Sequence, residues 1–342
     1  MITVLIFTYK RHLLLRRALS YWATTHANVI VADGTQSRFD GVIPLNVDYI
    51  HMPKQSLINR LLEMISCVHT PYVVFCADDD FISEYALNVH VDFLEKNKEY
   101  SAAQGIYTRF WINRDSMLLN WIFDYKYANR FKFDSNESTE RFLKAMKLPL
   151  MHYCYSVMRM DAMNSSLKLM TGVDEEYIST FELSFIAGIM NCGKYATLPI
   201  FYQARQMNDF ADWSGGISFE NWYEKNSANG YQRWRSNIMD LYSKNLTDKN
   251  LKTFANHFNI AFADFAAYSA AKVIKRKENE LQVGRSEPKK IKAFLKPYYY
   301  FFKNLMDQFL IFKFNIKSHY FFEKDFRKIK NIVLAESNCK NL

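Results

Sequence analysis

Three consecutive carboxylates, Asp78, Asp79 and Asp80, follow directly on the apolar run YVVFCA at 72–77. Such a run is typical of a buried strand. Carboxylate oxygens suit Mn²⁺ and Mg²⁺, and Mg²⁺ commonly bridges one or two carboxylates to substrate phosphates. The alternative is an acidic first turn of the next helix, where the helix N-terminus favours negative charge. Because three adjacent negative charges repel one another unless a cation offsets them, we predict a metal site with Asp80 and Asp78 as ligands.

Two other polar clusters also come at the ends of apolar runs. Residues 8–11 (TYKR) close the run that starts at residue 2, and residues 33–35 (DGT) follow the run at 28–32. The four apolar runs alternate with segments of helical spacing: the runs are 2–8, 28–32, 46–51 and 72–77, and the helical segments are 10–25, 55–68 and 83–96. This alternation predicts an α/β fold with a parallel sheet covered by helices on both faces. Ligands bind at the carboxyl ends of the strands in such sheets, so we expect the three polar clusters to share one site.

The later part of the chain shows a mixed pattern. We expect strands at 101–110, 152–159 and 195–202 and helices at 137–147, 180–192 and over much of 218–280. Pro199 would make the third of these strands an edge strand, because proline cannot donate to a strand ladder. The segment LQVGRSEPKK at 281–290 is typical of a linker. The predicted organisation is a catalytic α/β domain at 1–215, a helical segment at 216–280 that packs on it, and a basic aromatic helical tail at 281–342.

Composition limits the class of protein. The chain has 342 residues, of which 49% are hydrophobic, and it contains only 10 Gly and 7 Pro, so a folded core is expected rather than a low-complexity chain. Five scattered cysteines without a CxxC pair favour reduced thiols in a cytoplasmic protein over a disulfide framework or a zinc site. We expect neither a signal peptide at the N-terminus nor a membrane-spanning helix, because no run of 18 apolar residues occurs.

The positive charge lies in the tail. Residues 271–342 contain 17 Lys and Arg against 7 Asp and Glu, a balance of +10, whereas the first 270 residues hold 27 against 28. Eleven aromatic residues fall between 297 and 322, interleaved with lysines. Aromatic rings and lysine stems favour an anionic membrane interface, so we predict that 291–330 binds the inner face of the cell membrane. The alternative is packing on the sheet domain or on a second subunit of a homo-oligomer; a nucleic-acid partner is not expected.

Four segments together resemble the family 2-type glycosyltransferases with the GT-A fold, in particular the bacterial subgroup with a DDDF version of the DxD motif. They are VLIFTYKRHLLLRRAL (4–19), VIVADGT (29–35), TPYVVFCADDDFI (70–82) and YSAAQGIY (100–107). The likeness runs in order over roughly 1–210. It implies a GT-A fold with a helical extension, a nucleotide-sugar donor, Mn²⁺ or Mg²⁺, and sugar transfer with inversion.

The resemblance also implies roles for single residues. Thr8 and Asp33 would contact the nucleobase and ribose, Asp78 the ribose or sugar, and Asp80 the metal that bridges the diphosphate. The other donor-site residues that we predict are Tyr9, Arg11, Lys54, Arg60 and Asp79, with Lys10 as a further positive charge. A charged surface residue is the plainer interpretation of each cation taken singly. Gln203 or Arg205 would take the place near the diphosphate that a histidine holds in many relatives.

An inverting transfer needs a base that accepts the proton of the acceptor hydroxyl. In ISTFELSFIAGIMNCGKYATLP at 178–199, Glu182 matches the position of the family's acidic base, with Gly193 and Pro199 following. The usual Glu-Asp pair is here Phe181-Glu182. Ser179 and Glu182 also match a capping box, which is the structural alternative for this carboxylate. The stretch at 174–176 (DEE) is the second choice for the base, and His152 is a further candidate base or acceptor contact.

We therefore predict a metal-dependent, inverting glycosyltransferase that moves a sugar to a glycan or lipid-linked acceptor in surface polysaccharide biosynthesis. One alternative is a nucleotidyl- or phosphoryl-transferase, although the chain has no GxxxxGK[ST] or GxGxxG loop. The other is a non-catalytic glycan-binding scaffold on the same fold. A haloacid dehalogenase-type phosphatase is excluded, because Val31 stands where its nucleophilic aspartate would be.

Overall fold

A computed structural model of the chain describes residues 1–113, 118–123, 132–147, 153–170, 178–207, 229–244, 246–283 and 316–338. Within these residues, a nine-stranded sheet runs through the centre of the molecule in the order β3-β2-β1-β4-β8-β6-β9-β5, with β7 pairing to β6. The strands are β1 (Ile2–Thr8), β2 (Asn28–Asp33), β3 (Val47–His51), β4 (Tyr72–Phe75), β5 (Phe81–Ile82), β6 (Tyr100–Asn113), β7 (Leu118–Phe123), β8 (Val157–Arg159) and β9 (Lys194–Gln206).

Most of the sheet runs in one direction. β3, β2, β1 and β4 are parallel neighbours, and β6 and β9 are parallel to each other. β8 is antiparallel to both β4 and β6, so β6 and β9 point the same way as the first four strands. Their carboxyl ends therefore lie at one edge of the sheet, which confirms the predicted fold class and places the end of β9 beside the ends of β1, β2 and β4.

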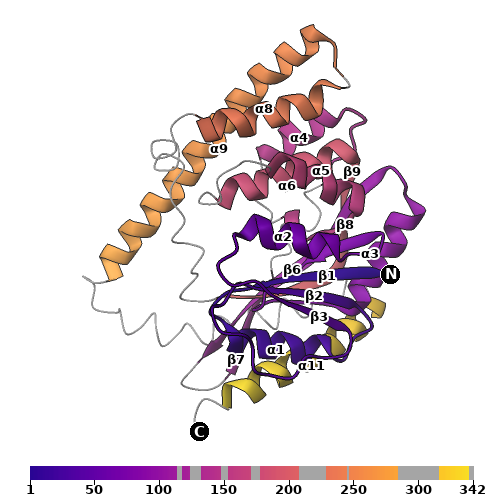
Figure 1. Cartoon of the computed structure of the whole chain (residues 1–342), viewed down its shortest axis with the longest axis vertical. Coiled ribbons are helices and arrows are strands. Elements are labelled where there is room, and N and C mark those ends of the chain that lie inside the picture. The colour runs from indigo at the N-terminus through magenta and orange to yellow at the C-terminus, as the bar shows by residue number, and fades with distance from the viewer. Residues whose placement is uncertain are drawn as a thin grey trace.

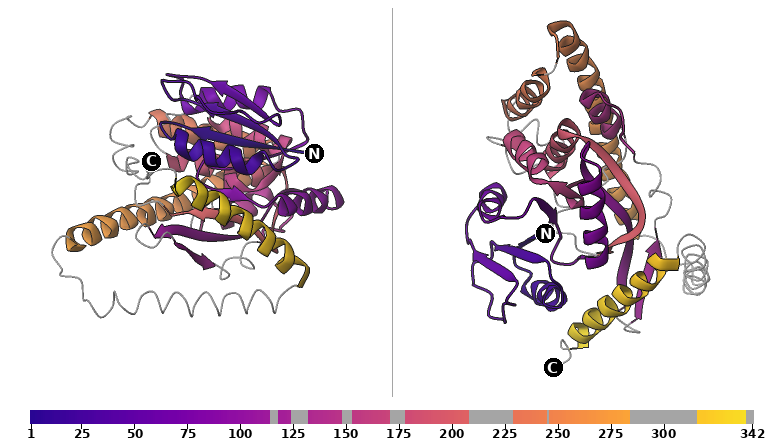
Figure 2. Two further views of the ribbon diagram at one scale, coloured as in Figure 1. Left: turned by 90° about the horizontal axis from the view of Figure 1, so that it is seen from below. Right: turned by 90° about the vertical axis from the view of Figure 1, so that its right-hand side faces the viewer.

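Helices cover both faces of the sheet (Figure 1). One core contains buried residues of α1 (His12–Trp22), α3 (Glu84–Lys96) and α11 (Ile316–Asn338). The other contains residues of α2 (Leu57–Ser66), α4 (Ser138–Met146), α5 (Met160–Met170) and α6 (Ile178–Cys192). α8 (Asn229–Ser243) and α9 (Asp248–Val283) stack on α4, α5 and α6, away from the sheet (Figures 1 and 2).

The helix starts near the sheet edge follow from local sequence. The Ser83 hydroxyl accepts the N–H of Ala86 at the start of α3, and the Ser56 hydroxyl accepts the N–H of Asn59 at the start of α2. A serine at this position satisfies an N–H group that has no partner inside the helix, which stabilises the helix by about 1 kcal/mol. The first four predicted strands and three predicted helices are all present, with ends that differ from the prediction by a few residues.

Several elements differ from the prediction. β5, β7 and α5 were not expected, and 153–159 forms a short 3-10 turn (Tyr153–Tyr155) followed by β8. β9 is not an edge strand, since it lies between β6 and β5. Pro199 falls where the β6–β9 register shifts, a position at which a missing N–H breaks no regular ladder bond. α9 runs to Val283, so the first residues of the predicted linker are helical, and 284–315 lies outside the described residues.

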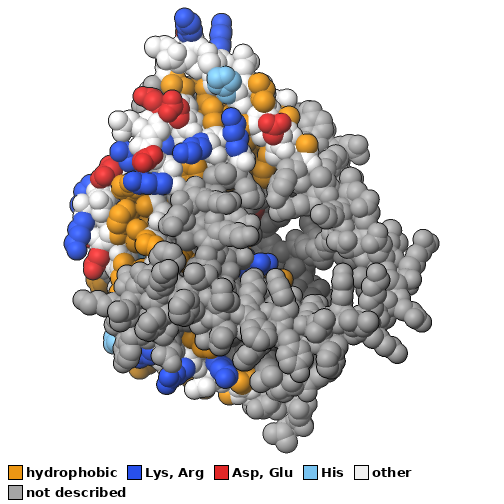
Figure 3. All heavy atoms as spheres, turned by 180° about the vertical axis from the view of Figure 1, so that it is seen from behind, with side chains coloured by type: hydrophobic (Ala, Val, Ile, Leu, Met, Phe, Trp, Pro, Cys, Tyr) orange, Lys and Arg blue, Asp and Glu red, His pale blue; other side chains and the backbone are white. Residues whose placement is uncertain are grey.

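The last described helix packs on the sheet domain. Ile329 and Val333 of α11 are buried in the same core as Tyr21 of α1, and Lys328 Nζ lies 4.3 Å from the centre of the Tyr21 ring. Over these residues the tail follows the packing alternative, whereas the membrane prediction for 291–315 falls outside the described residues. No helix in the described part of the chain is both long and apolar enough to cross a membrane. The end of the molecule formed by α8 and α9 carries charges of both signs (Figure 3).

Candidate active site

Four polar groups from distant parts of the chain meet at the carboxyl edge of the sheet. Thr8 ends β1, Asp33 ends β2, residues 78–80 follow β4, and Arg205 is near the end of β9. The N–H of Asp80 donates to the carbonyl of Ala77 over 3.1 Å, which turns the chain after β4 and holds the three aspartates at this edge. All three are buried, with exposed fractions of 2–8%.

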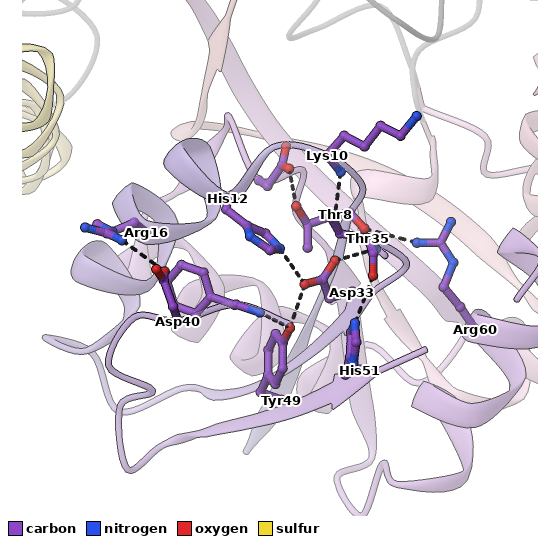
Figure 4. A network of polar contacts seen from close by, with 12 residues as sticks. Thr8, Lys10, His12, Arg16, Asp33, Thr35, Asp40, Tyr49, His51 and Arg60 are labelled. Carbon is purple, nitrogen blue, oxygen red and sulfur yellow. Dashed lines mark hydrogen bonds and ion pairs between the residues drawn. The ribbon is translucent and has the colours of Figure 1, made fainter. Parts of the chain in front are cut away.

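The Asp33 cluster consists of Asp33, His12, Thr35 and Tyr49 (Figure 4). Asp33 Oδ1 accepts the N–H of Thr35 over 2.8 Å, and Oδ2 contacts the Tyr49 hydroxyl at 2.6 Å and His12 Nε2 at 2.8 Å. Burial raises the pKa of Asp33, but its hydrogen bonds with Thr35, Tyr49 and His12 lower the pKa by more, so the net pKa lies below its ordinary value. A backbone N–H, a tyrosine hydroxyl and a histidine ring thus hold Asp33 as an ionised acceptor.

Arg60 braces the turn that follows β1 and β2 (Figure 4). Its Nη1 donates to the carbonyl of Thr8 over 3.1 Å, and the same carbonyl accepts the N–H of Gly34 over 3.0 Å. A Cβ added at Gly34 would lie 2.7 Å from Arg60 Nη1, so only glycine lets the guanidinium approach this closely. Arg60 is 7% exposed, so it supports this turn from inside the fold.

Asp78, Asp79 and Asp80 together are called the aspartate cluster. Two arginines at and near the start of α1 contact the first two of these residues. Thr8 Oγ1 donates to Asp78 Oδ2 over 2.8 Å, and Arg11 Nη2 lies 3.3 Å from Asp78 Oδ1. Arg11 also pairs with the Asp79 carboxylate, while Arg17 Nη2 donates to the Asp79 carbonyl over 3.1 Å. Arginine charge therefore offsets the repulsion between the adjacent carboxylates.

Asp80 faces the end of β9. Its Oδ1 accepts the N–H of Gln206 over 2.9 Å, and its Oδ2 accepts Gln203 Nε2–H over 3.0 Å and lies 3.4 Å from Arg205 Nε. The Arg205 guanidinium lies 5.1 Å from the ring centre of Tyr155 and 5.9 Å from that of Tyr107. Gln203 and Arg205 are the two residues expected near the position of the histidine found in many relatives. Both contact Asp80, the predicted metal ligand.

Burial dominates the acidity of this cluster. Burial, followed by the charges of Asp79 and other neighbours, raises the pKa of Asp80 to about 7. Burial likewise raises the pKa of Asp78 to about 7, although the Arg11 charge opposes the rise. Burial is the largest single effect and lowers the pKa of Arg205, but the neighbouring charges, that of Asp80 first, together raise that pKa by more, so the guanidinium stays protonated. The pKa of Asp33 is thus lowered in its cluster, whereas the pKa values of Asp78 and Asp80 are raised in theirs.

The chemistry of the aspartate cluster suits a hard cation. All of its side-chain acceptors are oxygens, and each carboxylate oxygen has lone pairs beyond the hydrogen bonds it accepts. Gln203 Oε1 is buried without a hydrogen-bond partner, so it adds an oxygen acceptor beside Asp80. Among the described residues no three His, Cys, Asp or Glu side chains converge on a single point. Water or phosphate oxygens would therefore have to complete the coordination of a cation here, which is common for Mg²⁺.

The base predicted from the sequence is Glu182. It is half-buried on α6, and α6 begins at Ile178, so Ser179 is not at the N-cap and the predicted capping box is wrong. Burial raises the pKa of the Cys154 thiol, the Glu182 charge raises it further, and the Arg205 charge lowers it. Cys154 is thus within electrostatic reach of both Glu182 and Arg205. His152 and the stretch 174–176 lie outside the described residues.

The remaining predicted residues lie farther out. Tyr9 is 51% exposed, with Lys10 Nζ 5.0 Å from its ring centre. Lys10 and Lys54 are exposed, and both have left-handed backbone conformations, with φ of 56° and 65°. Neither lysine contacts the aspartate cluster in the described part of the chain, so their role toward a diphosphate stays a prediction.

Sequence reasoning missed three residues of the site: His12, Arg17 and Tyr49. His12 and Arg17 both lie on α1, and both reach the sheet edge, where His12 contacts Asp33 and Arg17 contacts the Asp79 carbonyl. Their signal was a charged side chain on the apolar face of a predicted helix: Arg17 is 4% exposed. Tyr49 lies on the same face of β3 as the buried Val47, and its pairing with Asp33 depends on β3 lying next to β2, which the sequence does not show.

Comparison with known proteins agrees with this geometry. The family model described as "Glycosyl transferase family 2" matches residues 3–166. Residues 1–349 of S. aureus TarS in complex with UDP-GlcNAc have a similar structure, with a TM-score of 0.51 at 11% identity over 76% of this chain and 72% of that one. The same TarS fragment in complex with UDP gives 0.47 at 12% identity over 77% and 72%. No curated protein matches the chain.

The family match and the fold point to the same conclusion from independent sides, one from sequence and one from the arrangement of the strands. Assignment to the DDDF subgroup stays a prediction. Residues 3–166 form a glycosyl transferase family 2 domain on a GT-A fold, and the chain is a glycosyltransferase.

Proposed function

We propose that the enzyme moves a sugar from a nucleotide-sugar donor to a hydroxyl group of a glycan or lipid-linked acceptor, with Mn²⁺ or Mg²⁺ and with inversion. The observation that carries this proposal is the meeting of Asp78, Asp80, Arg11 and Arg205 at the carboxyl edge of a GT-A sheet. A nucleoside diphosphate leaving group gains negative charge as the glycosidic bond breaks, and fixed positive charge at that point lowers the barrier.

The donor would lie across the ends of β1, β2 and β4. The Asp33 cluster lies beside the turn after β1 and is held by several hydrogen bonds, so it suits the nucleoside. His51 joins this cluster, because its Nε2–H donates to the Thr35 carbonyl over 2.8 Å. The diphosphate would lie over the aspartate cluster, where Asp80, Asp78 and Gln203 Oε1 would hold the cation. The cation would neutralise the departing diphosphate.

Glu182 is the proposed base. It is a half-buried carboxylate, and both Glu182 and Arg205 lie within electrostatic reach of Cys154, which supports a position next to the donor site. A base here would remove the acceptor proton as the hydroxyl attacks the anomeric carbon from the side opposite the leaving group. That geometry inverts the configuration at this carbon.

Surface polysaccharide biosynthesis at the inner face of the cell membrane is the proposed setting. Its support is the family match together with the concentration of basic and aromatic residues in the tail, of which residues 284–315 lie outside the described part. Lipid-linked acceptors are found at such a surface, and a basic aromatic segment binds anionic lipids.

A ligand panel tests the proposed function. TarS binds UDP-GlcNAc, so UDP sugars come first in a thermal-shift screen of nucleoside diphosphates and nucleotide sugars, each with and without Mn²⁺. A ligand present at 100 times its Kd stabilises the folded state by about 2.7 kcal/mol, which gives a clear rise in Tm. A panel in which no nucleotide raises Tm would contradict the proposed donor site.

Replacement of Glu182 separates binding from chemistry. With the donor found above, Glu182→Gln should keep the nucleotide-dependent rise in Tm and lose transfer by roughly 10²–10⁴-fold, the usual contribution of a general base. Glu63→Gln, a change of an exposed acid on α2, is the matched control and should transfer normally. Full transfer by Glu182→Gln would rule out this base, and an α-configured product from an α-configured donor would rule out inversion.

A further inference from the structure

Arg205 lies against Asp80 Oδ2, one of the two oxygens that a cation would bind. The Arg205 Nε atom is 3.4 Å from Oδ2, and the side chain of Arg205 is 23% exposed whereas that of Asp80 is 4% exposed. The rings of Tyr155 and Tyr107 flank the guanidinium at 5.1 Å and 5.9 Å. A divalent cation forms bonds of about 2.0–2.1 Å to carboxylate oxygens, so it cannot share this face of Asp80 with the guanidinium.

The charges of the aspartate cluster balance without any added ion. When all three aspartates are ionised, their three negative charges are matched by the three positive charges of Arg11, Arg17 and Arg205, which lie within electrostatic reach. A divalent cation that entered this ionised cluster alone would leave two unbalanced positive charges in a buried site, and the diphosphate of a nucleotide sugar that entered alone would leave two unbalanced negative charges. Unbalanced charge in a poorly solvated site is costly, so either ligand alone is disfavoured. Together they add no net charge.

Asp80 is kept in place by groups other than Arg205. The N–H of Gln206 and the amide of Gln203 bind its two oxygens over 2.9 Å and 3.0 Å, and both belong to β9, which pairs with β6 along its length. If the guanidinium moved, the carboxylate would keep its orientation. The Arg205 side chain, by contrast, is partly exposed and carries several rotatable bonds, so it is the movable member of the pair.

We propose that Arg205 is the counter-ion of Asp80 in the donor-free enzyme and gives up that place to a divalent cation only when the donor diphosphate binds. This proposal rests on the proposed function, since it assigns a regulation to the same donor site. The guanidinium then turns to the arriving phosphate oxygens, with which it forms charge-assisted hydrogen bonds. Cation and nucleotide therefore bind synergistically, and the enzyme without its donor binds cations weakly.

The first test uses the unaltered protein and measures Mn²⁺ binding by electron paramagnetic resonance, with and without saturating UDP. We expect UDP to tighten Mn²⁺ binding by at least about tenfold, within the usual range of coupling between two sites. Equal Mn²⁺ affinity with and without UDP would overturn the proposal, whatever any variant shows. If UDP fails to bind even with Mn²⁺ and no other nucleotide replaces it, the donor site itself is wrong.

The second test removes the counter-ion. Arg205→Gln should bind Mn²⁺ alone at least about fivefold more tightly than the unaltered protein, because no cation competes for Asp80. The same variant should bind UDP more weakly, so the synergy between Mn²⁺ and UDP shrinks. Opposite changes in the two affinities would not follow from a loss of folding, which would weaken both.

Two further variants serve as controls for Arg205→Gln. Arg205→Lys keeps a positive charge and should retain most of the synergy. Arg109→Gln removes an arginine from the position opposite Arg205 on β6, where its Nη1 lies 4.0 Å from the Met207 sulfur, and should leave both affinities unchanged. An Arg205→Gln variant that binds Mn²⁺ with unchanged or lower affinity, while UDP still binds with Mn²⁺, would overturn the exchange and leave the proposed function standing.

Discussion

Asp33 and Asp80 are both buried carboxylates at the carboxyl ends of strands in one sheet, yet their partners differ in kind. Asp33 is held by a backbone N–H, a tyrosine hydroxyl and a histidine. Asp80 is held by a backbone N–H, a glutamine amide and an arginine. The pKa of Asp33 lies below its ordinary value, whereas the pKa of Asp80 is raised to about 7.

The difference shows how one fold gives one aspartate fixed partners and another aspartate a partner that a ligand can replace. Three short hydrogen bonds stabilise the ionised form of Asp33. Asp33 therefore needs no metal ion or arginine as a further partner. Asp80 lies among two other carboxylates, and burial together with their repulsion outweighs the help of its partners. A carboxylate of that kind gains most from a new cation, so the aspartate cluster suits chemistry and the Asp33 cluster suits recognition.

The largest expected effect comes from Asp80→Asn. The amide keeps an oxygen for the N–H of Gln206 but loses the charge that a cation or Arg205 requires, so sugar transfer should fall by roughly 10²–10³-fold or more. Transfer is measured with the donor identified by the ligand panel, and circular dichroism checks the fold. Asp40→Asn removes an acid with an 85% exposed side chain and should transfer normally. Retained activity in Asp80→Asn would place the diphosphate site elsewhere.

Asp33→Ala should act mainly on stability. It leaves the Thr35 N–H and the Tyr49 hydroxyl without their buried acceptor, which costs about 1–3 kcal/mol in the free energy of unfolding. Urea unfolding followed by fluorescence measures this difference. Asp48→Ala, a change of an exposed acid on β3, should shift the free energy by no more than about 0.5 kcal/mol. Equal stability of the two variants would mean that the Asp33 cluster is not a structural unit.

The two carboxylates should give stability opposite dependences on pH. Folded Asp80, with a pKa of about 7 against an ordinary 3.8, binds its proton more tightly than the unfolded chain does, so its contribution to stability falls as pH rises from about 4 to about 7. Folded Asp33 has a lowered pKa, so its contribution is present above the ordinary value and is lost as pH falls through the folded pKa.

Urea unfolding of the metal-free protein at several pH values separates these contributions. In Asp80→Asn the decline of stability between pH about 4 and about 7 should become shallower. In Asp33→Asn the loss of stability on acidification should become shallower instead. Parallel pH profiles for both variants and the unaltered protein would remove the contrast between the clusters.

The smallest effect is expected from Tyr49→Phe. Asp33 loses one of three partners, and the N–H of Phe39, which donates to the Tyr49 oxygen over 3.0 Å, loses its acceptor. The free energy of unfolding should fall by about 0.5–1.5 kcal/mol, less than in Asp33→Ala. Tyr85→Phe on α3 serves as a control for removal of a hydroxyl. A loss as large as that of Asp33→Ala would assign most of the stability of the cluster to this one hydroxyl.

Much of the first hundred residues could be predicted, because each strand is a short apolar run and each helix has its own period and start signal. Serine hydroxyls at 56 and 83 accept an N–H at the starts of two of these helices, which shows that the start signals are local. Beyond residue 100 prediction was weaker. β8 was read as a longer strand from 152, and β5 has only two residues, which carry no period of their own. Such short strands exist because a neighbour supplies their hydrogen bonds.

The site divides in the same way. Asp33 and Asp78–Asp80 were found because each follows an apolar run, and their shared edge follows from the parallel order of β1, β2 and β4. The link between Asp80 and the end of β9 spans more than 120 positions in the chain. It depends on β8 running antiparallel between β4 and β6, which turns β6 and β9 so that Arg205 reaches the aspartates.

The sequence by itself determined that negative charge would collect at the end of a buried strand, since local apolar runs and turn residues are properties of neighbouring positions. Only the tertiary structure decided which cations meet that charge. The sequence suggested Arg11 and Arg205 as donor-site residues, but it did not show that they and Arg17 pair with the aspartates. Their pairing with the aspartates follows from the order and direction of strands, because Coulomb attraction in a buried site depends on distances that no local pattern encodes.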